Sequence, residues 1–179
     1  KEDIINTFKV SPEKIEVTYE AAEEEYFKAK KTKSNTPYIL YVGNAYPHKN
    51  LNSLLDAIKL LISNKNRPTI KLIIVSPRDV FSQRLISEIE SKGLQNHVEL
   101  KGYQDPQELS NLFSNSFAYV FPSLSEGFGI PGLNAMAAKI PLLSSNIPVL
   151  KEVYGDAAIY FDPKNPKDIG EKIETLLKN

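Results

Sequence analysis

The chain has 179 residues, of which 41% are hydrophobic and 25% are charged, which is sufficient for one globular domain with a substantial core. Its 22 basic and 22 acidic residues leave no net charge, so the composition gives no support to a nucleic-acid partner. There is no cysteine, which excludes a disulfide framework and a cysteine-based metal site.

The first 35 residues differ in composition from the rest of the chain. The stretch EKIEVTYEAAEEEYFKAKKTKSN carries one short strand signal, followed by an acidic run and then a basic run. Such charge runs favour a solvent-exposed segment. We therefore interpret residues 1–35 as an entry segment or linker with an edge strand, and residues 36–179 as one domain.

From residue 37 onward, short β-rich runs alternate with helical stretches. The runs that predict strands are 37–43, 70–76, 98–102, 118–123, 140–145 and 157–162. Helices are predicted at 50–65, 79–93, 105–116, within 125–146, at 148–154 and from 166 onward. Six strands alternating with helices predict an α/β fold, in which a six-stranded parallel sheet has helices on both faces.

Ligands of open α/β sheets bind beyond the carboxyl ends of the strands. Three loops at those ends stand out: GNAYPHKN at 43–50, GYQDP at 102–106 and SLSEGFGIPG at 123–132. Because parallel strands end at the same edge, we expect these loops to converge. The sequence therefore predicts one ligand site at that edge.

The third loop combines a carboxylate, Glu126, with glycines directly in front of a helix. The first N–H groups of a helix have no partner within it, and they bind anions well. Lys49, in the first loop, can neutralise a diphosphate, so the loops together favour a phosphate-bearing ligand. Taken singly, the candidates have ordinary interpretations: solvated polar residues (Lys49, Asn134), turn residues (His48, Gly127, Gly129) and a packing residue (Tyr103).

The sequence contains no motif for several other kinds of active site. There is no His-Glu-x-x-His, no Gly-x-Ser-x-Gly and no Walker A motif. EGFGIPG matches a dinucleotide-binding fingerprint by its letters, but it follows the fourth core strand, and no acidic residue ends a strand about 20 residues further on. These observations disfavour metal, hydrolase and dinucleotide sites.

The same residues resemble a known family. SEGFGIPGLNAMAAKIPLLSSNIPVLKEVYGDAAIYFDP resembles the signature of retaining glycosyltransferases of the GT-B architecture, family four. PYILYVGNAYPHKNLNSLLDAI resembles the start of that family's C-terminal domain, and VELKGYQDPQELSNLFSNSFAYVFPS resembles its middle. The resemblance implies that the chain is the Rossmann-like, donor-binding C-terminal half of a two-domain enzyme.

The resemblance also implies roles for individual residues. Glu126 matches the catalytic glutamate that contacts hydroxyls of the donor sugar, and Lys49 matches the basic residue that binds the diphosphate. Two positions depart from the family: Asn134 replaces a second glutamate at the ribose, and Asn44 replaces a common arginine. The remaining implied donor contacts are Gly102, Tyr103 and Gln104 near the nucleobase, and Gly127, Phe128, Gly129 and Ile130 near the phosphates and sugar.

The activity implied is transfer of a hexose from a GDP- or UDP-sugar, with no cofactor and no metal, to a glycan or lipid-linked saccharide. The acceptor is expected to bind the missing N-terminal domain, so the fragment alone is expected to be inactive. A start at Lys1 fits such a fragment. No signal peptide or bilayer-spanning run is visible, and we expect a cytoplasmic protein whose full-length form associates peripherally with the inner face of the membrane.

Two alternatives stay open at this stage. One is a non-catalytic nucleotide-sugar-binding module, which the neutral residues Asn44 and Asn134 favour. The other is a nucleotide-sugar epimerase of the same architecture, for which the sequence shows no catalytic residues of its own.

Overall fold

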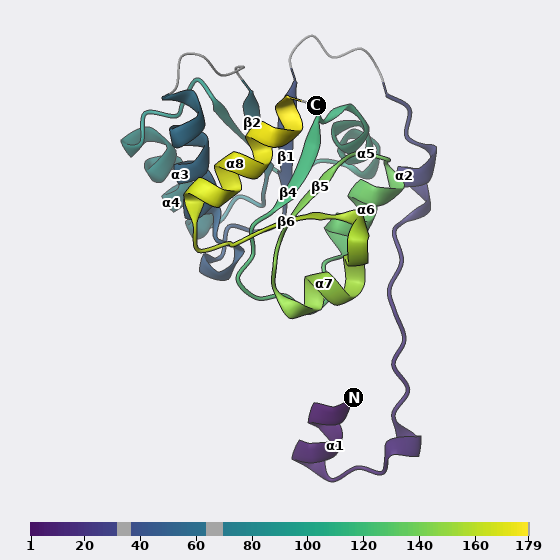
Figure 1. The fold of residues 1–179 in the computed structure, drawn as a ribbon. Coiled ribbons are helices and arrows are strands. Elements are labelled where there is room, and N and C mark those ends of the chain that lie inside the picture. Colours follow the sequence, from purple (N-terminus) through teal and green to yellow (C-terminus); the bar gives the residue numbers. More distant parts are fainter. Residues whose placement is uncertain (32–36, 64–69, 179) are drawn as a thin grey trace.

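The computed structural model describes residues 1–31, 37–63 and 70–178. Within them, six strands form one sheet in the order β3-β2-β1-β4-β5-β6, and every neighbouring pair is parallel (Figure 1). The strands are β1 (Tyr38–Val42), β2 (Lys71–Val75), β3 (Val98–Lys101), β4 (Ala118–Phe121), β5 (Leu142–Ser145) and β6 (Ile159–Phe161). Each strand lies within a run predicted from the sequence, which confirms the parallel α/β fold.

Helices cover both faces of the sheet. One face carries α3, α4 and α8, and the other carries α2, α5 and α6 (Figure 1). The helices and helical turns of this body are α2 (Glu24–Lys28), η2 (Pro47–Lys49), α3 (Leu51–Ile62), α4 (Val80–Ser91), α5 (Pro106–Asn115), α6 (Ile130–Ala137), α7 (Pro148–Tyr154), η3 (Gly155–Ala157) and α8 (Pro166–Leu177). None of the helices in the described residues combines the length and the apolar character that a bilayer crossing requires.

The helix starts predicted from the sequence are set by capping side chains. The carboxylate of Asp105 accepts a hydrogen bond from the N–H of Glu108, and Pro106 occupies the first position of α5. Asp79 caps α4 in the same way and forms a capping box with Ser82. The predicted helix 50–65 is seen as α3, and its last two predicted residues lie outside the described part of the chain.

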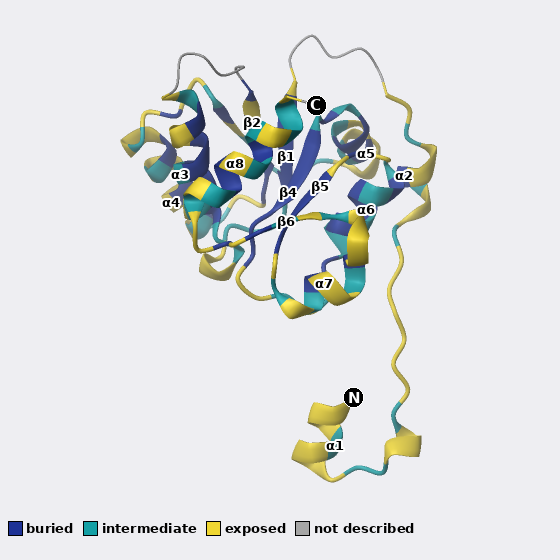
Figure 2. Ribbon diagram, in the orientation of Figure 1, coloured by how far each residue is buried: buried dark blue, intermediate teal, exposed yellow. Residues whose placement is uncertain are grey.

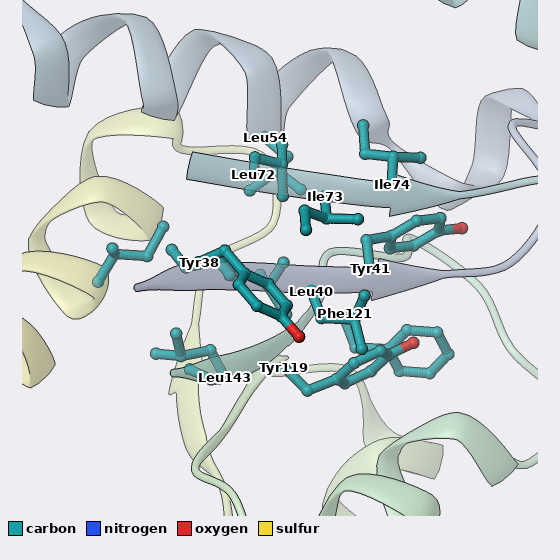
Figure 3. Packing of buried hydrophobic residues seen from close by; sticks show 14 of the residues in the cluster. Tyr38, Leu40, Tyr41, Leu54, Leu72, Ile73, Ile74, Tyr119, Phe121 and Leu143 are labelled. Carbon is teal, nitrogen blue, oxygen red and sulfur yellow. The ribbon is translucent and has the colours of Figure 1, made fainter. Parts of the chain in front are cut away.

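The core lies between the sheet and its two helical layers, and the inner strands β1, β2, β4 and β5 are buried almost throughout (Figure 2). Leu54 of α3 and Leu72 of β2 are both fully buried members of this core (Figure 3). The rings of Phe113 and Tyr119 stack with centroids 5.2 Å apart, and Tyr26 of α2 meets Phe113 edge-on at 5.0 Å. Burial on both faces holds the carboxyl edge of the sheet, and the loops that leave it, on a rigid support.

In its described part, residues 1–31, the N-terminal segment does not form the edge strand expected within residues 1–35. Its first two elements, α1 (Glu2–Phe8) and η1 (Pro12–Lys14), lie apart from the sheet, and an extended stretch leads from them to α2 (Figures 1 and 2). Val17 and Tyr19 of this stretch are exposed. A strand needs a neighbour to complete its hydrogen bonds, and no described strand pairs with this segment. The predicted boundary between residues 35 and 36 falls outside the described residues.

Candidate functional site

The loops that follow β1 and β4 lie side by side because these two strands are neighbours in the sheet. The N–H of Leu124, in the β4 loop, donates to the carbonyl of His48, in the β1 loop, over 2.8 Å. The amide of Asn50 donates to the carbonyl of Pro122 over 3.0 Å and to that of Pro163 over 2.7 Å. The first and third of the three candidate loops therefore converge, as expected.

Asn50 is a structural residue of this edge that the sequence analysis did not identify. Its backbone is left-handed, with φ 58°, a conformation that asparagine tolerates better than most residues. Its side-chain oxygen accepts from the hydroxyl of Ser53 over 2.7 Å, so both ends of the amide are used. The sequence signal that could have identified it is the position of an asparagine directly before a predicted helix. The hydrogen bonds of the Asn50 amide anchor the backbone directly after Lys49.

Lys49 and Glu126 form an ion pair where the two loops meet. The Lys49 Nζ donates to the Glu126 Oε1 over 2.6 Å, and the two side chains are only 15% and 10% exposed. The Nζ also lies 5.8 Å from the centroid of the Phe121 ring. A charge-assisted hydrogen bond shielded from water is stronger than one at the surface. The pair is thus a charged contact of this edge that is largely shielded from water.

A cavity of about 280 Å³ opens beside this ion pair. The start of α6 borders it through Ile130 and Pro131, and a helix start carries partial positive charge. One cation, one carboxylate and a helix N-terminus therefore face the same space, which suits an anion next to a hydroxyl-rich group. The residues that line the cavity are Val42, Gly43, Asn44, Lys49, Phe121, Glu126, Phe128, Gly129, Ile130 and Pro131.

Three tyrosine hydroxyls, which we call the anchor hydroxyls, hold backbone carbonyls of this lining. They donate from Tyr41 to Asn44 over 2.8 Å, from Tyr119 to Val42 over 3.1 Å and from Tyr154 to Gly129 over 2.5 Å. Figure 3 shows the hydroxyls of Tyr41 and Tyr119 directed toward the carboxyl end of β1. Burial raises the pKa of all three tyrosines, so they remain neutral donors.

The anchor hydroxyls were not identified from the sequence. Tyr41 and Tyr119 lie in apolar strand runs, where an aromatic residue indicates only packing. Tyr154 is 25 residues away from the glycine that it contacts. No local pattern links it to the site.

The second candidate loop lies at the same edge but does not reach the cavity. Gly102, Tyr103 and Gln104 follow β3, which is two strands away from β1. Tyr103 is 82% exposed, and the Gln104 amide donates to the Tyr103 carbonyl over 2.9 Å. Their proposed place near a nucleobase stays a prediction.

Asn134 lies one turn further along α6 than Ile130 and is not part of the cavity lining. It is 6% exposed, and its Oδ1 accepts from the backbone N–H of Glu23, at the start of α2, over 3.3 Å. It therefore ties α6 to the segment that enters the domain. Gly127 belongs to the β4 loop but is not part of the lining, and a side chain added there would meet no atom within 4 Å.

A second cavity, of about 340 Å³, lies between the start of α3 and the start of α4. The rings of Tyr46 and Phe81 meet in it at 4.9 Å, and the Arg84 guanidinium lies 5.7 Å from the centroid of the Phe81 ring. None of the predicted donor contacts lines it, so we place the candidate site at the smaller cavity. Among the described residues, no group of three or more His, Cys, Asp or Glu side chains is arranged to hold a metal ion.

Comparison with known proteins gives concordant matches. A family model described as "Glycosyl transferases group 1" matches residues 22–179. The chain is 35% identical over 176 residues to "O-antigen chain mannosyltransferase RfbU" of Salmonella typhimurium, which is 98% of this chain and 48% of that protein. It is 33% identical over 142 residues to "O-antigen chain mannosyltransferase B" of Escherichia coli, which is 79% of this chain and 37% of that protein.

A solved structure shares the fold. The crystal structure of a glycosyltransferase from Rickettsia africae superposes with a TM-score of 0.85 and 22% identity, over 99% of this chain and 50% of that one. The chain thus spans about half the length, or less, of the relatives it matches.

Proposed function

The chain belongs to the glycosyl transferases group 1 family, and we propose that it binds the nucleotide-sugar donor of a retaining hexosyltransferase. The observation that carries this proposal is the Lys49–Glu126 pair, which lies beside a cavity bordered by the start of α6. The relatives named as mannosyltransferases support mannose as the transferred hexose. The donor is proposed to be a GDP- or UDP-sugar.

The proposed chemistry follows from the charges at the cavity. Glycosyl transfer breaks the bond between the sugar and a diphosphate, and negative charge builds up on the diphosphate as it leaves. Lys49 and the N–H of Ile130, the first residue of α6, stabilise that charge. Glu126 accepts hydrogen bonds from sugar hydroxyls and holds the ring in position. The two side chains are in contact, which matches a ligand in which sugar and diphosphate are directly joined.

The rest of the reaction is proposed to need the part of the protein outside this chain. The chain covers 48% of the first relative, and the acceptor, a glycan or a lipid-linked saccharide, is proposed to bind the other half. The 179-residue chain alone is therefore expected not to transfer sugar. The full-length enzyme is proposed to act in the cytoplasm, at the inner face of the membrane.

The test is calorimetric titration of the 179-residue chain with GDP, UDP and ADP, and with the corresponding nucleotide-sugars. We expect GDP or UDP to bind, and Lys49→Met to weaken that binding by about 1.5–3 kcal/mol, the contribution of a hydrogen bond to a charged group. Lys92→Met is the matched control, because Lys92 also forms a half-buried ion pair, with Asp56 between α3 and α4. Absence of binding, or equal losses in the two variants, would contradict the proposal.

Added EDTA tests the metal-free part of the proposal. Lys49 and the helix start supply the positive charge that a diphosphate needs. Binding is therefore expected to be the same with EDTA as with magnesium. A requirement for magnesium would show that these groups are insufficient.

A non-catalytic nucleotide-sugar-binding module is the second candidate function. Two observations favour it: Asn44 adds no charge to the cavity, and Asn134 is buried against the backbone of Glu23. The two functions differ in turnover, since a binding module would bind the nucleotide-sugar without transferring its sugar. Release of nucleoside diphosphate by the full-length protein, in the presence of donor and acceptor, distinguishes them.

A further inference from the structure

Tyr154 is placed directly beneath the glycine-rich turn that begins α6. Its side chain is 3% exposed, and its hydroxyl donates to the carbonyl of Gly129 over 2.5 Å. A Cβ atom added to Gly129 would lie 2.3 Å from that hydroxyl, and one added to Gly132 would lie 2.3 Å from the same ring. The tyrosine thus fills the space that both glycines leave open.

The carbonyl of Gly129 is held by two donors. Besides the tyrosine hydroxyl, it accepts the N–H of Gly132 over 3.0 Å. It is therefore directed toward the buried side chain of Tyr154, which does not line the cavity. A carbonyl oxygen carries partial negative charge, so one that faced the cavity would repel a diphosphate.

The direction of this carbonyl also sets the direction of the next N–H. In a planar trans peptide, the C=O of one residue and the N–H of the following residue point in opposite directions. With the Gly129 carbonyl held by Tyr154, the N–H of Ile130 is directed away from Tyr154. Ile130 lines the cavity, and as the first residue of α6 its N–H has no partner within the helix.

We propose that Tyr154 is a positioning residue of the donor site, whose hydroxyl fixes the peptide between Gly129 and Ile130 so that its N–H faces the diphosphate. The inference rests on the proposed function, because it assumes that a diphosphate occupies this cavity. Because Tyr154 is the last residue of α7, this role gives α7 a part in donor binding, although α7 contributes no residue to the cavity lining.

The chain offers a matched control for this role. Tyr38, at the opposite end of the sheet, is also buried, and its hydroxyl donates to the carbonyl of Leu112 over 2.7 Å. Tyr38→Phe and Tyr154→Phe each remove one buried hydroxyl that donates to a backbone carbonyl. Their effects on stability should therefore be similar, and a difference between them in ligand affinity reports on the site.

The experiment measures melting temperature and nucleotide affinity of the 179-residue chain and of both variants, with GDP and UDP as probes. Each substitution should lower the melting temperature by about 2–4 °C. Only Tyr154→Phe should raise the dissociation constant, by about three- to tenfold. For each nucleotide that the wild-type chain binds, the increase should be similar, because the contact is to phosphate and not to the base.

The possible failures are distinguishable. If the wild-type chain binds a nucleoside diphosphate and Tyr154→Phe binds it equally well, the positioning role is refuted and the proposed function stands. If both variants lose the same affinity, the hydroxyl serves stability alone, and the inference is again refuted. If the wild-type chain binds neither nucleotide, the proposed function fails and the inference fails with it.

Discussion

Replacement of Glu126 by glutamine is expected to tighten the binding of a nucleoside diphosphate. The Glu126 carboxylate accepts a hydrogen bond from the Lys49 ammonium group over 2.6 Å. A diphosphate that binds Lys49 must therefore replace Glu126 as the acceptor of this hydrogen bond. It must also come close to the negative charge of the Glu126 carboxylate. Glutamine keeps an oxygen that can accept from Lys49, so the lysine stays in place while the competing charge is removed.

The size of the effect follows from the strength of that contact. A hydrogen bond with an ionised partner contributes about 1.5–3 kcal/mol, and the neutral amide retains part of it. The expected gain is about 1–2 kcal/mol, which corresponds to roughly 5- to 30-fold in the dissociation constant. The gain should be larger at low ionic strength, since Lys49 then acts on the phosphates as an uncompensated charge.

The assay is calorimetric titration of the 179-residue chain and its variants with the nucleoside diphosphate that binds the wild type. Asp56→Asn is the control, because it removes the carboxylate of another ion pair, with Lys92, that lies away from the cavity. Its affinity should equal that of the wild type. Unchanged or weaker binding by Glu126→Gln would refute the idea that Glu126 and the diphosphate compete for Lys49.

Two further predictions concern the backbone that supports the site. Asn50→Ala should lower the free energy of unfolding by about 2–3 kcal/mol, because it loses the bonds to Pro122 and Pro163 and places alanine at a left-handed φ. Asn50→Gly loses the same bonds without the backbone strain, so urea unfolding should place it between Asn50→Ala and the wild type. Gly132→Ala should cost about 1–3 kcal/mol, because its methyl group would lie 2.3 Å from the Tyr154 ring. Gly127→Ala, where nothing lies within 4 Å, should change stability by less than about 0.5 kcal/mol in thermal unfolding, and equal losses at the two glycines would contradict the packing argument.

The fold was predictable because its signals are local. Apolar runs of strand length, separated by helical spacing and by caps such as Asp105, gave all six strands. The edge strand predicted for the entry segment is absent from residues 1–31, for a complementary reason. An apolar run indicates that a segment suits a strand, but a strand forms only where a neighbour completes its hydrogen bonds, and residues 1–31 have none in the sheet.

The position of the charged groups of the candidate site was predictable from the sequence. Lys49 and Glu126 follow strands that end at one edge, so the topology alone brings their loops together. The supporting contacts were not predictable, because they join residues far apart in the chain. Asn50 bonds to Pro163, 113 residues away, and Tyr154 to Gly129, 25 residues away. Spacing within one element carries no information about such pairs.

The tyrosine side chains explain why two positions of the site are glycine. A Cβ atom at Gly43 would lie 2.8 Å from the hydroxyl of Tyr41, and one at Gly129 would lie 2.3 Å from that of Tyr154. Both glycines also have positive φ, at 153° and 97°. Flexibility of the loop is therefore not what these glycines provide. They allow a tyrosine hydroxyl to reach a backbone carbonyl of each loop, at Asn44 and at Gly129, from a side chain that does not line the cavity. The backbone of both loops is thereby anchored where a phosphate would contact it.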